Sequence, residues 1–240
     1  MALLLKNGSI FLHIPKTGGN WVREILSKLD LVDKEIGHKH ADVDRVLYDR
    51  IVNLSFMEFF KKKFSKSLTP FRNSQYPFIF CFVRHPLQWY ESWFKYMSQP
   101  NREWRNWPKR IGDFDWHPNS LINGTGSNDF KQFVKNVLKL YPGYVTHLYG
   151  FYTKREIDFI GKQENLRNDL INVLNIMKLN FDKDLIIEYE RVGVSPKPRT
   201  PMIWDIELRN KVIQVEYSGL LRYGYLGGQR QNTAGLPKDE

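Results

Sequence analysis

The chain has 240 residues, of which 42% are hydrophobic, a composition typical of one globular domain with a substantial core. Its single cysteine, Cys81, excludes a disulfide framework, and no apolar run is long enough to span a bilayer. The formal net charge of +10 favours an anionic partner, such as a nucleotide, an acidic or sulfated sugar, a nucleic acid or a membrane surface. We expect a single domain over residues 1–240, located in the cytoplasm and without a secretion signal.

Apolar stretches alternate with amphipathic ones along the chain. Residues 9–14 predict a buried strand, and the apolar spacing over 21–29 predicts a helix. A mixed helix is expected within 51–66, a second buried strand over 78–83, and a helix that begins at Pro86. The remaining expected elements are helices over 128–140, 164–178 and 204–221, a strand over 157–161 and a loop over 191–202. This order predicts an α/β fold with a central parallel sheet flanked by helices and with ligands at the carboxyl ends of its strands.

The segment FLHIPKTGGNW, residues 11–21, joins the first expected strand to its helix. A glycine-containing turn at a helix N-terminus lets free N–H groups approach an anion, and the helix dipole favours negative charge there. Lys16 adds a full positive charge, and Thr17 and Asn20 add possible hydrogen-bond donors. The lysine precedes the glycines, unlike in the Walker pattern, so this is not an ordinary ATP loop. A strand–turn–helix corner with a solvent-exposed lysine fits the same residues.

The segment FVRHPLQWYESW, residues 82–93, also places a cationic residue at the end of an expected strand and before a helix. Arg84 at the strand end can bind a phosphate with two N–H groups, and Ser92, two helical turns further on, can donate its hydroxyl to it. A salt bridge at the strand end and a small packing residue are the alternative interpretations of Arg84 and Ser92. Two anion sites at neighbouring strand ends predict a ligand with two separated anionic groups.

These segments resemble motifs of the sulfotransferases that use 3′-phosphoadenosine-5′-phosphosulfate (PAPS), in particular the carbohydrate-type and bacterial members. PKTGG-N-W resembles their 5′-phosphosulfate loop, the Arg84–Ser92 pattern their 3′-phosphate motif, and FIGKQENLRNDL, residues 159–170, a stretch of the carbohydrate-type members. The resemblance extends from residue 10 to about residue 225. Gly19 and Asn20 stand where the family often has hydroxyl residues.

The resemblance implies a P-loop-like sulfotransferase fold, transfer of a sulfuryl group to a hydroxyl or an amine, release of adenosine 3′,5′-bisphosphate (PAP), and no metal. The implied donor-binding residues are Lys16, Thr17, Gly18, Gly19, Asn20, Trp21, Arg84 and Ser92, with Ser195 and Lys197 in a loop that closes over the 3′-phosphate. That last loop fits a proline-rich surface connection as well.

The transfer requires two tasks of the protein. The first is to stabilise the negative charge on the leaving phosphate, and the second is to remove a proton from the acceptor. Lys16 is placed for the first task. For the second, a His-x-His segment of the carbohydrate-type relatives resembles His38-Lys39-His40, which makes His40 the first candidate base and His38 the second. A zinc pair and two exposed loop histidines are the alternatives, and His13 is expected to be a core residue.

Tryptophans and cations gather between residues 89 and 116. Trp89 and Trp93 are expected to face the core, so the candidates for binding the acceptor are Trp104, Trp107 and Trp116, with Arg105. An insertion that packs over the sheet edge would give the same pattern, and so would a surface for single-stranded nucleic acid, although nucleic acid is the less favoured partner. The rival functions are a kinase-like phosphoryl transferase and a basic nucleic-acid-binding protein. The sequence identifies neither the acceptor nor the oligomeric state.

Overall fold

The computed structural model describes residues 2–37, 40–46, 77–102, 104–107, 117–154, 157–193, 195–196, 198 and 200–226. The helix expected within 51–66 and the candidate residues His38, Trp116 and Lys197 lie outside the described residues. Within those ranges, no helix has both the length and the apolar composition needed to cross a membrane.

In the described part of the chain, five strands form one mixed sheet in the order β3-β1-β2-β4-β5. Their bounds are Ala2–Leu5 for β1, Ile10–Leu12 for β2, Val32–Ile36 for β3, Ile79–Val83 for β4 and Phe159–Lys162 for β5. Strands β2, β4 and β5 are parallel, whereas β1 is antiparallel to both of its neighbours, β2 and β3. The α/β class is confirmed, but the sheet is mixed, and the expected parallel pairing holds only for β2, β4 and β5.

Strand β1 is antiparallel to β2 because a tight turn joins the two strands. Sequence periodicity did not reveal this turn. Gly8 has a φ of +85°, and its N–H donates to the carbonyl of Leu5 at 2.8 Å, so the chain reverses directly into β2. Strand β3 is antiparallel to β1 and therefore runs in the same direction as β2. The carboxyl ends of β2, β3, β4 and β5 consequently lie along one edge of the sheet.

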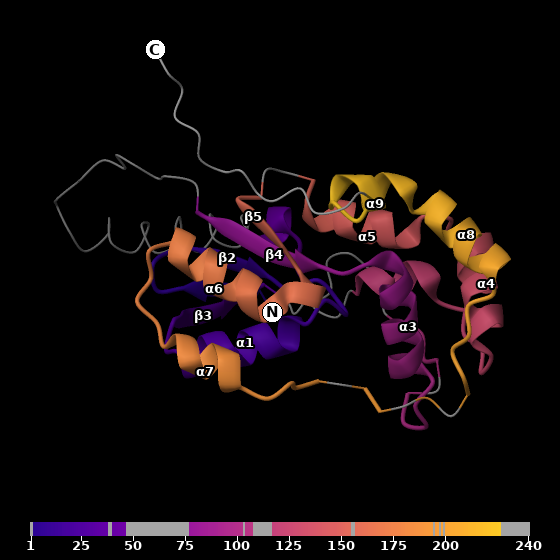
Figure 1. Cartoon of the computed structure of the whole chain (residues 1–240), viewed down its shortest axis with the longest axis horizontal. Helices are drawn as coiled ribbons and strands as arrows, with labels where there is room; N and C mark the ends of the chain where they lie inside the picture. The colour runs from indigo at the N-terminus through magenta and orange to yellow at the C-terminus, as the bar shows by residue number, and fades with distance from the viewer. Residues whose placement is uncertain are drawn as a thin grey trace, which may run out of the picture.

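Helices cover both faces of the sheet. Their bounds are Gly19–Lys28 for α1, Pro86–Met97 for α3, Phe130–Leu140 for α4, Tyr144–Tyr152 for α5, Leu166–Ile176 for α6, Lys183–Glu188 for α7, Ile206–Val215 for α8 and Tyr217–Arg222 for α9. Short 3-10 turns, η1 at Pro118–Ile122 and η2 at Gln163–Asn165, precede α4 and α6. Figure 1 shows α1, α6 and α7 gathered on one side of the molecule, and α3, α4, α5, α8 and α9 on the other.

The alternation of side chains along β4 explains the two layers. Phe80 and Phe82 are buried against α1, α6 and α7, whereas Ile79, Cys81 and Val83 are buried against α3, α4, α5 and α8. Both faces of this central strand are therefore apolar, as its sequence predicts.

A buried carboxylate ties the helices of the second layer together. Glu216, between α8 and α9, accepts hydrogen bonds from the Tyr90 hydroxyl at 3.0 Å, from the Val145 N–H at 3.1 Å and from the Thr146 N–H at 2.7 Å. Its side chain thus joins α3 and α5 to the C-terminal helices. Burial raises the pKa of Glu216, although these hydrogen bonds oppose the shift.

Candidate functional site

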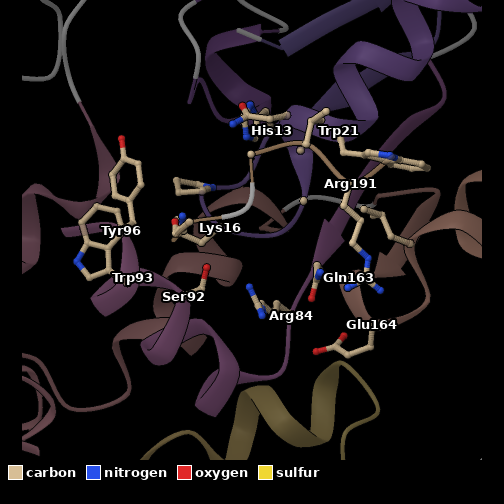
Figure 2. A pocket seen from close by; sticks show the side chains of 18 of the residues that line it. His13, Lys16, Trp21, Arg84, Ser92, Trp93, Tyr96, Gln163, Glu164 and Arg191 are labelled. Atoms are coloured by element: carbon tan, nitrogen blue, oxygen red, sulfur yellow. The ribbon is translucent and has the colours of Figure 1, made fainter. Parts of the chain in front are cut away.

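The carboxyl ends of the strands open into one pocket with a volume of about 570 Å³. His13, Pro15 and Lys16 follow β2, Arg84 follows β4, and Gln163 and Glu164 follow β5, and all of them line this pocket. Figure 2 shows Trp93 and Tyr96 at one end of the pocket and Trp21 and Arg191 at the other. The two segments that the sequence predicts to bind anions therefore share a single cavity.

The turn after β2 presents Lys16 to the pocket. Lys16 has a φ of +68° and Gly18 a φ of +87°, both in the left-handed region, so the turn is tight before α1 begins at Gly19. The indole N–H of Trp89 donates to the carbonyl of Pro15 at 3.1 Å and fixes the turn from the core side. The Lys16 ammonium lies 4.3 Å from the centre of the Tyr96 ring, a cation–π contact.

Thr17 belongs to the scaffold of this turn rather than to the lining of the pocket. Its hydroxyl is buried and donates to the carbonyl of Ile14 at 3.0 Å. Gly18, Gly19, Asn20 and Trp21 do line the pocket. Of the residues expected in this loop, Thr17 alone turns its side chain inward to the backbone of the turn.

Gly19 allows a close approach between α1 and the His13 imidazole. A Cβ atom at position 19 would lie 2.2 Å from Cδ2 of His13, well inside van der Waals contact. The absence of a side chain therefore lets the first turn of α1 and the His13 ring meet at the pocket wall. His13 is almost completely buried, as expected, and it also contributes to the pocket lining.

Arg84 is the cation at the end of β4. The hydroxyl of Tyr149 accepts from its backbone N–H and donates to its carbonyl, which fixes the backbone at the point where the strand ends. Burial lowers the pKa of the Arg84 guanidinium, which nevertheless stays charged. Its Nε atom is buried and has no hydrogen-bond partner in the described part of the chain.

Ser92 lines the same pocket from α3. Figure 2 shows its hydroxyl and the Arg84 guanidinium on the same side of the cavity. Helix α3 is anchored at its start by His85, whose Nδ1 accepts from the Leu87 N–H at 3.3 Å. Ser92 then lies two turns into the helix, which returns it to the side of the strand end, as the sequence predicts.

The 3-10 turn η2, which follows β5, supplies a carboxylate, Glu164, whose charge acts on Arg84. Glu164 accepts from the His85 N–H at 2.7 Å and from the Tyr225 hydroxyl at 3.0 Å. The Glu164 charge raises the pKa of Arg84, but less than burial lowers it. Glu164, which lines the pocket, therefore joins η2 to the start of α3 and to the segment after α9.

The far end of the pocket combines aromatic and polar groups. The Trp21 indole donates to the carbonyl of Glu190 at 3.0 Å, and the Arg167 guanidinium lies 5.5 Å from its ring centre. Gly193, with a φ of +70°, lies beside the Asn20 side chain. Ser195 lines the pocket together with Arg191 and Gly193.

His40 enters the pocket from the segment after β3. Its Nδ1 lies 3.3 Å from the carbonyl oxygen of His13, and its own carbonyl accepts from the Tyr152 hydroxyl at 2.8 Å. The following segment is held by Lys154, which forms ion pairs with Asp42 and Asp44. The first candidate base is therefore positioned by both β2 and α5.

His117 also lines the pocket, and it was not singled out in the sequence. Its ring centre lies 4.4 Å from that of His40, and its Nδ1 accepts from the Asn119 N–H at 3.0 Å. On the other side it stacks on Trp107, with ring centres 4.1 Å apart. One signal was present in the sequence: His117 precedes Pro118 just as His85 precedes Pro86, and both imidazoles cap the turn that follows.

Of the aromatic residues expected to bind an acceptor, the two that the structure describes, Trp104 and Trp107, do not line the pocket. Trp107 backs the His117 ring, and the Arg105 guanidinium lies 4.5 Å from the centre of the Trp107 ring. Trp104 packs against Phe133 and Phe94 in the core. The pocket wall is formed instead by residues of α3 that were expected to face only the core or were not singled out: Trp93, Lys95 and Tyr96.

The pocket is strongly cationic. Among the described residues that line it, five side chains are cationic, those of Lys16, Arg84, Lys95, Arg167 and Arg191, and one is a carboxylate, that of Glu164. A concave surface of one charge sign concentrates ions of the opposite sign. Within the described ranges, no group of three or more His, Cys, Asp or Glu side chains is arranged to hold a metal ion. The site is chemically suited to a multiply charged anion.

Comparisons of the chain with protein-family models, with curated proteins and with solved structures find no match.

Proposed function

We propose that this protein is a PAPS-dependent sulfotransferase with a P-loop-like fold, which transfers a sulfuryl group to the hydroxyl or amine of an acceptor. The observation that carries the proposal is that Lys16, Arg84 and Ser92, which belong to two separate sequence motifs, line one cationic pocket. Two anion sites in one cavity suit a nucleotide with phosphate groups at two positions.

The residues at the end of β4 fit such a donor. The buried Nε of Arg84 makes no hydrogen bond within the described residues, and Ser92 stands beside it at the pocket wall. A phosphate oxygen would satisfy this buried donor and offset the cost of burying the guanidinium charge. The residues that would hold the 3′-phosphate are therefore Arg84 and Ser92.

The turn after β2 fits the other end of the donor. Lys16 and the N–H groups at the start of α1 would hold the 5′-phosphosulfate and stabilise the negative charge that grows on the leaving phosphate. PAPS, when bound, supplies the sulfuryl group for transfer. Gly18 and Gly19 allow the close packing of this turn, because a Cβ at position 18 would meet Leu166 and a Cβ at position 19 would meet the His13 ring.

His40 is the group that would accept the proton of the acceptor. A general base must be unprotonated near neutral pH, and histidine is the side chain whose ordinary pKa allows this. The hydrogen bond from its Nδ1 to the His13 carbonyl fixes the ring orientation. Lys16, Arg84 and Ser92 hold the donor in this scheme, and His40 acts on the acceptor.

The test is a comparison of nucleotides followed by a search for turnover. PAP should raise the free energy of unfolding by about 2.7 kcal/mol at a hundredfold excess over its dissociation constant, with smaller shifts for AMP at the same concentration. Equal shifts for PAP and AMP would show that no site distinguishes the 3′-phosphate. PAPS should then be screened with phenols, alcohols, amines and polysaccharides, with the sulfated product detected by mass spectrometry.

The same screen separates the rival functions. Tighter binding of ATP than of PAP, with a dependence on magnesium, would indicate a kinase-like phosphoryl transferase. Binding to single-stranded nucleic acid that weakens steeply with salt and that PAP does not displace would indicate a nucleic-acid-binding protein.

A further inference from the structure

We propose that His117 binds the acceptor oxygen by a hydrogen bond from its Nε2–H, and that the pair His40–His117 selects a hydroxyl over an amine as the acceptor. This inference rests on the proposed sulfuryl transfer. It narrows the acceptor to one chemical class and adds a second catalytic histidine to the site.

The hydrogen-bond partner of His40 fixes the positions of its ring hydrogen and lone pair. Its Nδ1 lies 3.3 Å from the carbonyl oxygen of His13, and a carbonyl oxygen can only accept. Nδ1 therefore carries the hydrogen, and in the neutral ring Nε2 holds the lone pair. His40 is thus in the tautomer that accepts a proton at Nε2.

His117 is held in the opposite tautomer. Its Nδ1 accepts the backbone N–H of Asn119 at 3.0 Å, and a backbone N–H can only donate. Nδ1 therefore carries the lone pair, and the ring hydrogen is on Nε2. The same bond caps the 3-10 turn η1, so the local fold maintains this tautomer. The Nε2 atom of His117 is therefore a hydrogen-bond donor, whereas the Nε2 atom of His40 is an acceptor.

The two rings are close together, and the His117 ring is held from behind. Their centres lie 4.4 Å apart with an interplanar angle of 66°, and both side chains line the pocket. Trp107 stacks on His117 at 4.1 Å. The backbone of Trp107 is bound at both its N–H and its carbonyl by the Asn123 amide, at 2.9 and 2.8 Å. The donor and the acceptor are therefore presented from a rigid wall.

A hydroxyl oxygen matches this pair of groups, and an amine nitrogen does not. The hydroxyl donates its hydrogen to Nε2 of His40, and it has two lone pairs. One lone pair forms the bond to sulfur as the bond from sulfur to the donor's phosphate oxygen breaks, and that bonding pair leaves with the phosphate. The second lone pair accepts the His117 Nε2–H, and the hydroxyl proton moves to His40.

A neutral amine has a single lone pair, and that pair is consumed in attacking sulfur. The Nε2–H of His117 would then face a nitrogen that cannot accept it, and a donor left without an acceptor weakens binding of the transition state. Selection between oxygen and nitrogen acceptors therefore follows from the two tautomers.

Two matched variants isolate the Nε2–H. His117→Gln and His117→Met both remove the ring and the cap, but glutamine keeps an N–H donor near the position of Nε2 and methionine keeps none. Phenol and aniline are the probes, because they have the same shape and are both neutral near neutral pH. The parent should sulfate phenol about tenfold or more faster than aniline in kcat/KM. His117→Met should lose most of this preference through slower phenol sulfation, and His117→Gln should recover part of it.

A second measurement needs no acceptor. Imidazole nitrogen chemical shifts of the ¹⁵N-labelled protein with PAP bound should show a hydrogen on Nε2 of His117 and on Nδ1 of His40. The reverse assignment for His117 would overturn the inference, and so would equal phenol and aniline rates in the parent. Unchanged PAP affinity in both variants is expected, because neither contributes to the nucleotide site. A parent protein that does not bind PAP or transfer from PAPS would refute the proposed function instead.

Discussion

The hydroxyl of Tyr149 forms hydrogen bonds with both backbone polar groups of Arg84. It accepts from the Arg84 N–H at 3.1 Å and donates to the Arg84 carbonyl at 2.7 Å. The phenol is fully buried, and burial raises the pKa of Tyr149 well above its ordinary value. The hydroxyl therefore keeps its proton near neutral pH, and both hydrogen bonds persist. Together they set the direction in which the Arg84 guanidinium leaves the end of β4.

Tyr149→Phe should weaken PAP binding about twofold to tenfold, the range expected when neutral hydrogen bonds that orient a binding residue are lost. Turnover at saturating donor should change little, because Arg84 holds the donor and does not act on the reacting atoms. Titration calorimetry with PAP measures the first effect. An unchanged dissociation constant in a folded variant would mean that Arg84 does not depend on Tyr149.

Tyr152→Phe, one turn along α5, should have the complementary effect. The Tyr152 hydroxyl donates to the His40 carbonyl at 2.8 Å, so its removal loosens the segment that carries the proposed base. We expect kcat to fall about tenfold, with PAP affinity as in the parent protein. The two tyrosine variants are controls for each other. Equal losses of PAP affinity in both would point to a general disturbance of α5.

The residues of the proposed nucleotide site could be found from sequence because local rules place them. Lys16 precedes Gly18 and Gly19 after an apolar strand, Arg84 precedes a helix that starts with proline, and helical periodicity brings Ser92 back toward the strand end. Each of these positions depends on neighbours close in the chain, and the structure brings them into one pocket as expected.

Elements that depend on distant contacts could not be found in this way. Strand β1 is only four residues long, and β3 exposes Asp33, Lys34 and Glu35, so neither shows strong hydrophobic periodicity. His117 joins His40 only through tertiary packing. Trp93 lines the pocket although it is 3% exposed, because a helix at the pocket wall can face the core and the cavity at once.

Gly19→Ala should disrupt the pocket, because the new Cβ would lie 2.2 Å from the His13 ring. His13 cannot move far without breaking its contact with His40, so we expect a loss of about 1–3 kcal/mol in the free energy of unfolding, together with weaker PAP binding. Denaturant unfolding and calorimetry measure the two effects. Gly150→Ala in α5 is the matched control: nothing lies within 4 Å of its added Cβ, so alanine should stabilise the helix by up to about 1 kcal/mol.

Lys16→Ala should lower turnover about a hundredfold or more, with a smaller loss of PAP affinity, because the proposed role of this charge grows as the leaving phosphate develops. Single-turnover kinetics with PAPS separate the two effects. A variant that turns over like the parent protein would refute the role proposed for the turn after β2.

Tyr96 tests whether the cation–π contact prepares Lys16 for this role. The ammonium lies 4.3 Å from the ring centre, so Tyr96→Phe keeps the interacting face and Tyr96→Leu removes it. We expect Tyr96→Phe to behave like the parent protein and Tyr96→Leu to lose a few-fold in turnover. Identical rates for the two variants would show that the ring face does not position Lys16.

Protonation of His85 should lower the free energy of unfolding as the pH falls, and a single substitution can isolate this contribution. Burial lowers the pKa of His85 below its ordinary value of 6.5, although the charge of Glu164 opposes the shift. Its Nδ1 also accepts the Leu87 N–H, and protonation would remove that acceptor from the start of α3. The folded state therefore binds fewer protons at this site than the unfolded state. The resulting stability is fully present above pH 6.5 and is lost as the pH falls through the lowered folded value.

His85→Asn keeps a good helix-capping side chain and removes the titration. The free energy of unfolding of the parent, relative to that of His85→Asn, should therefore fall as the pH is lowered from about 7.5 toward 5, the window that contains the ordinary histidine pKa. Urea unfolding at several pH values measures the difference, and groups that titrate equally in both proteins cancel. NMR titration of the parent gives a direct check, because the His85 imidazole should titrate below 6.5. A His85 that titrates above that value, or a difference that grows on acidification, would contradict the burial and capping that the structure shows.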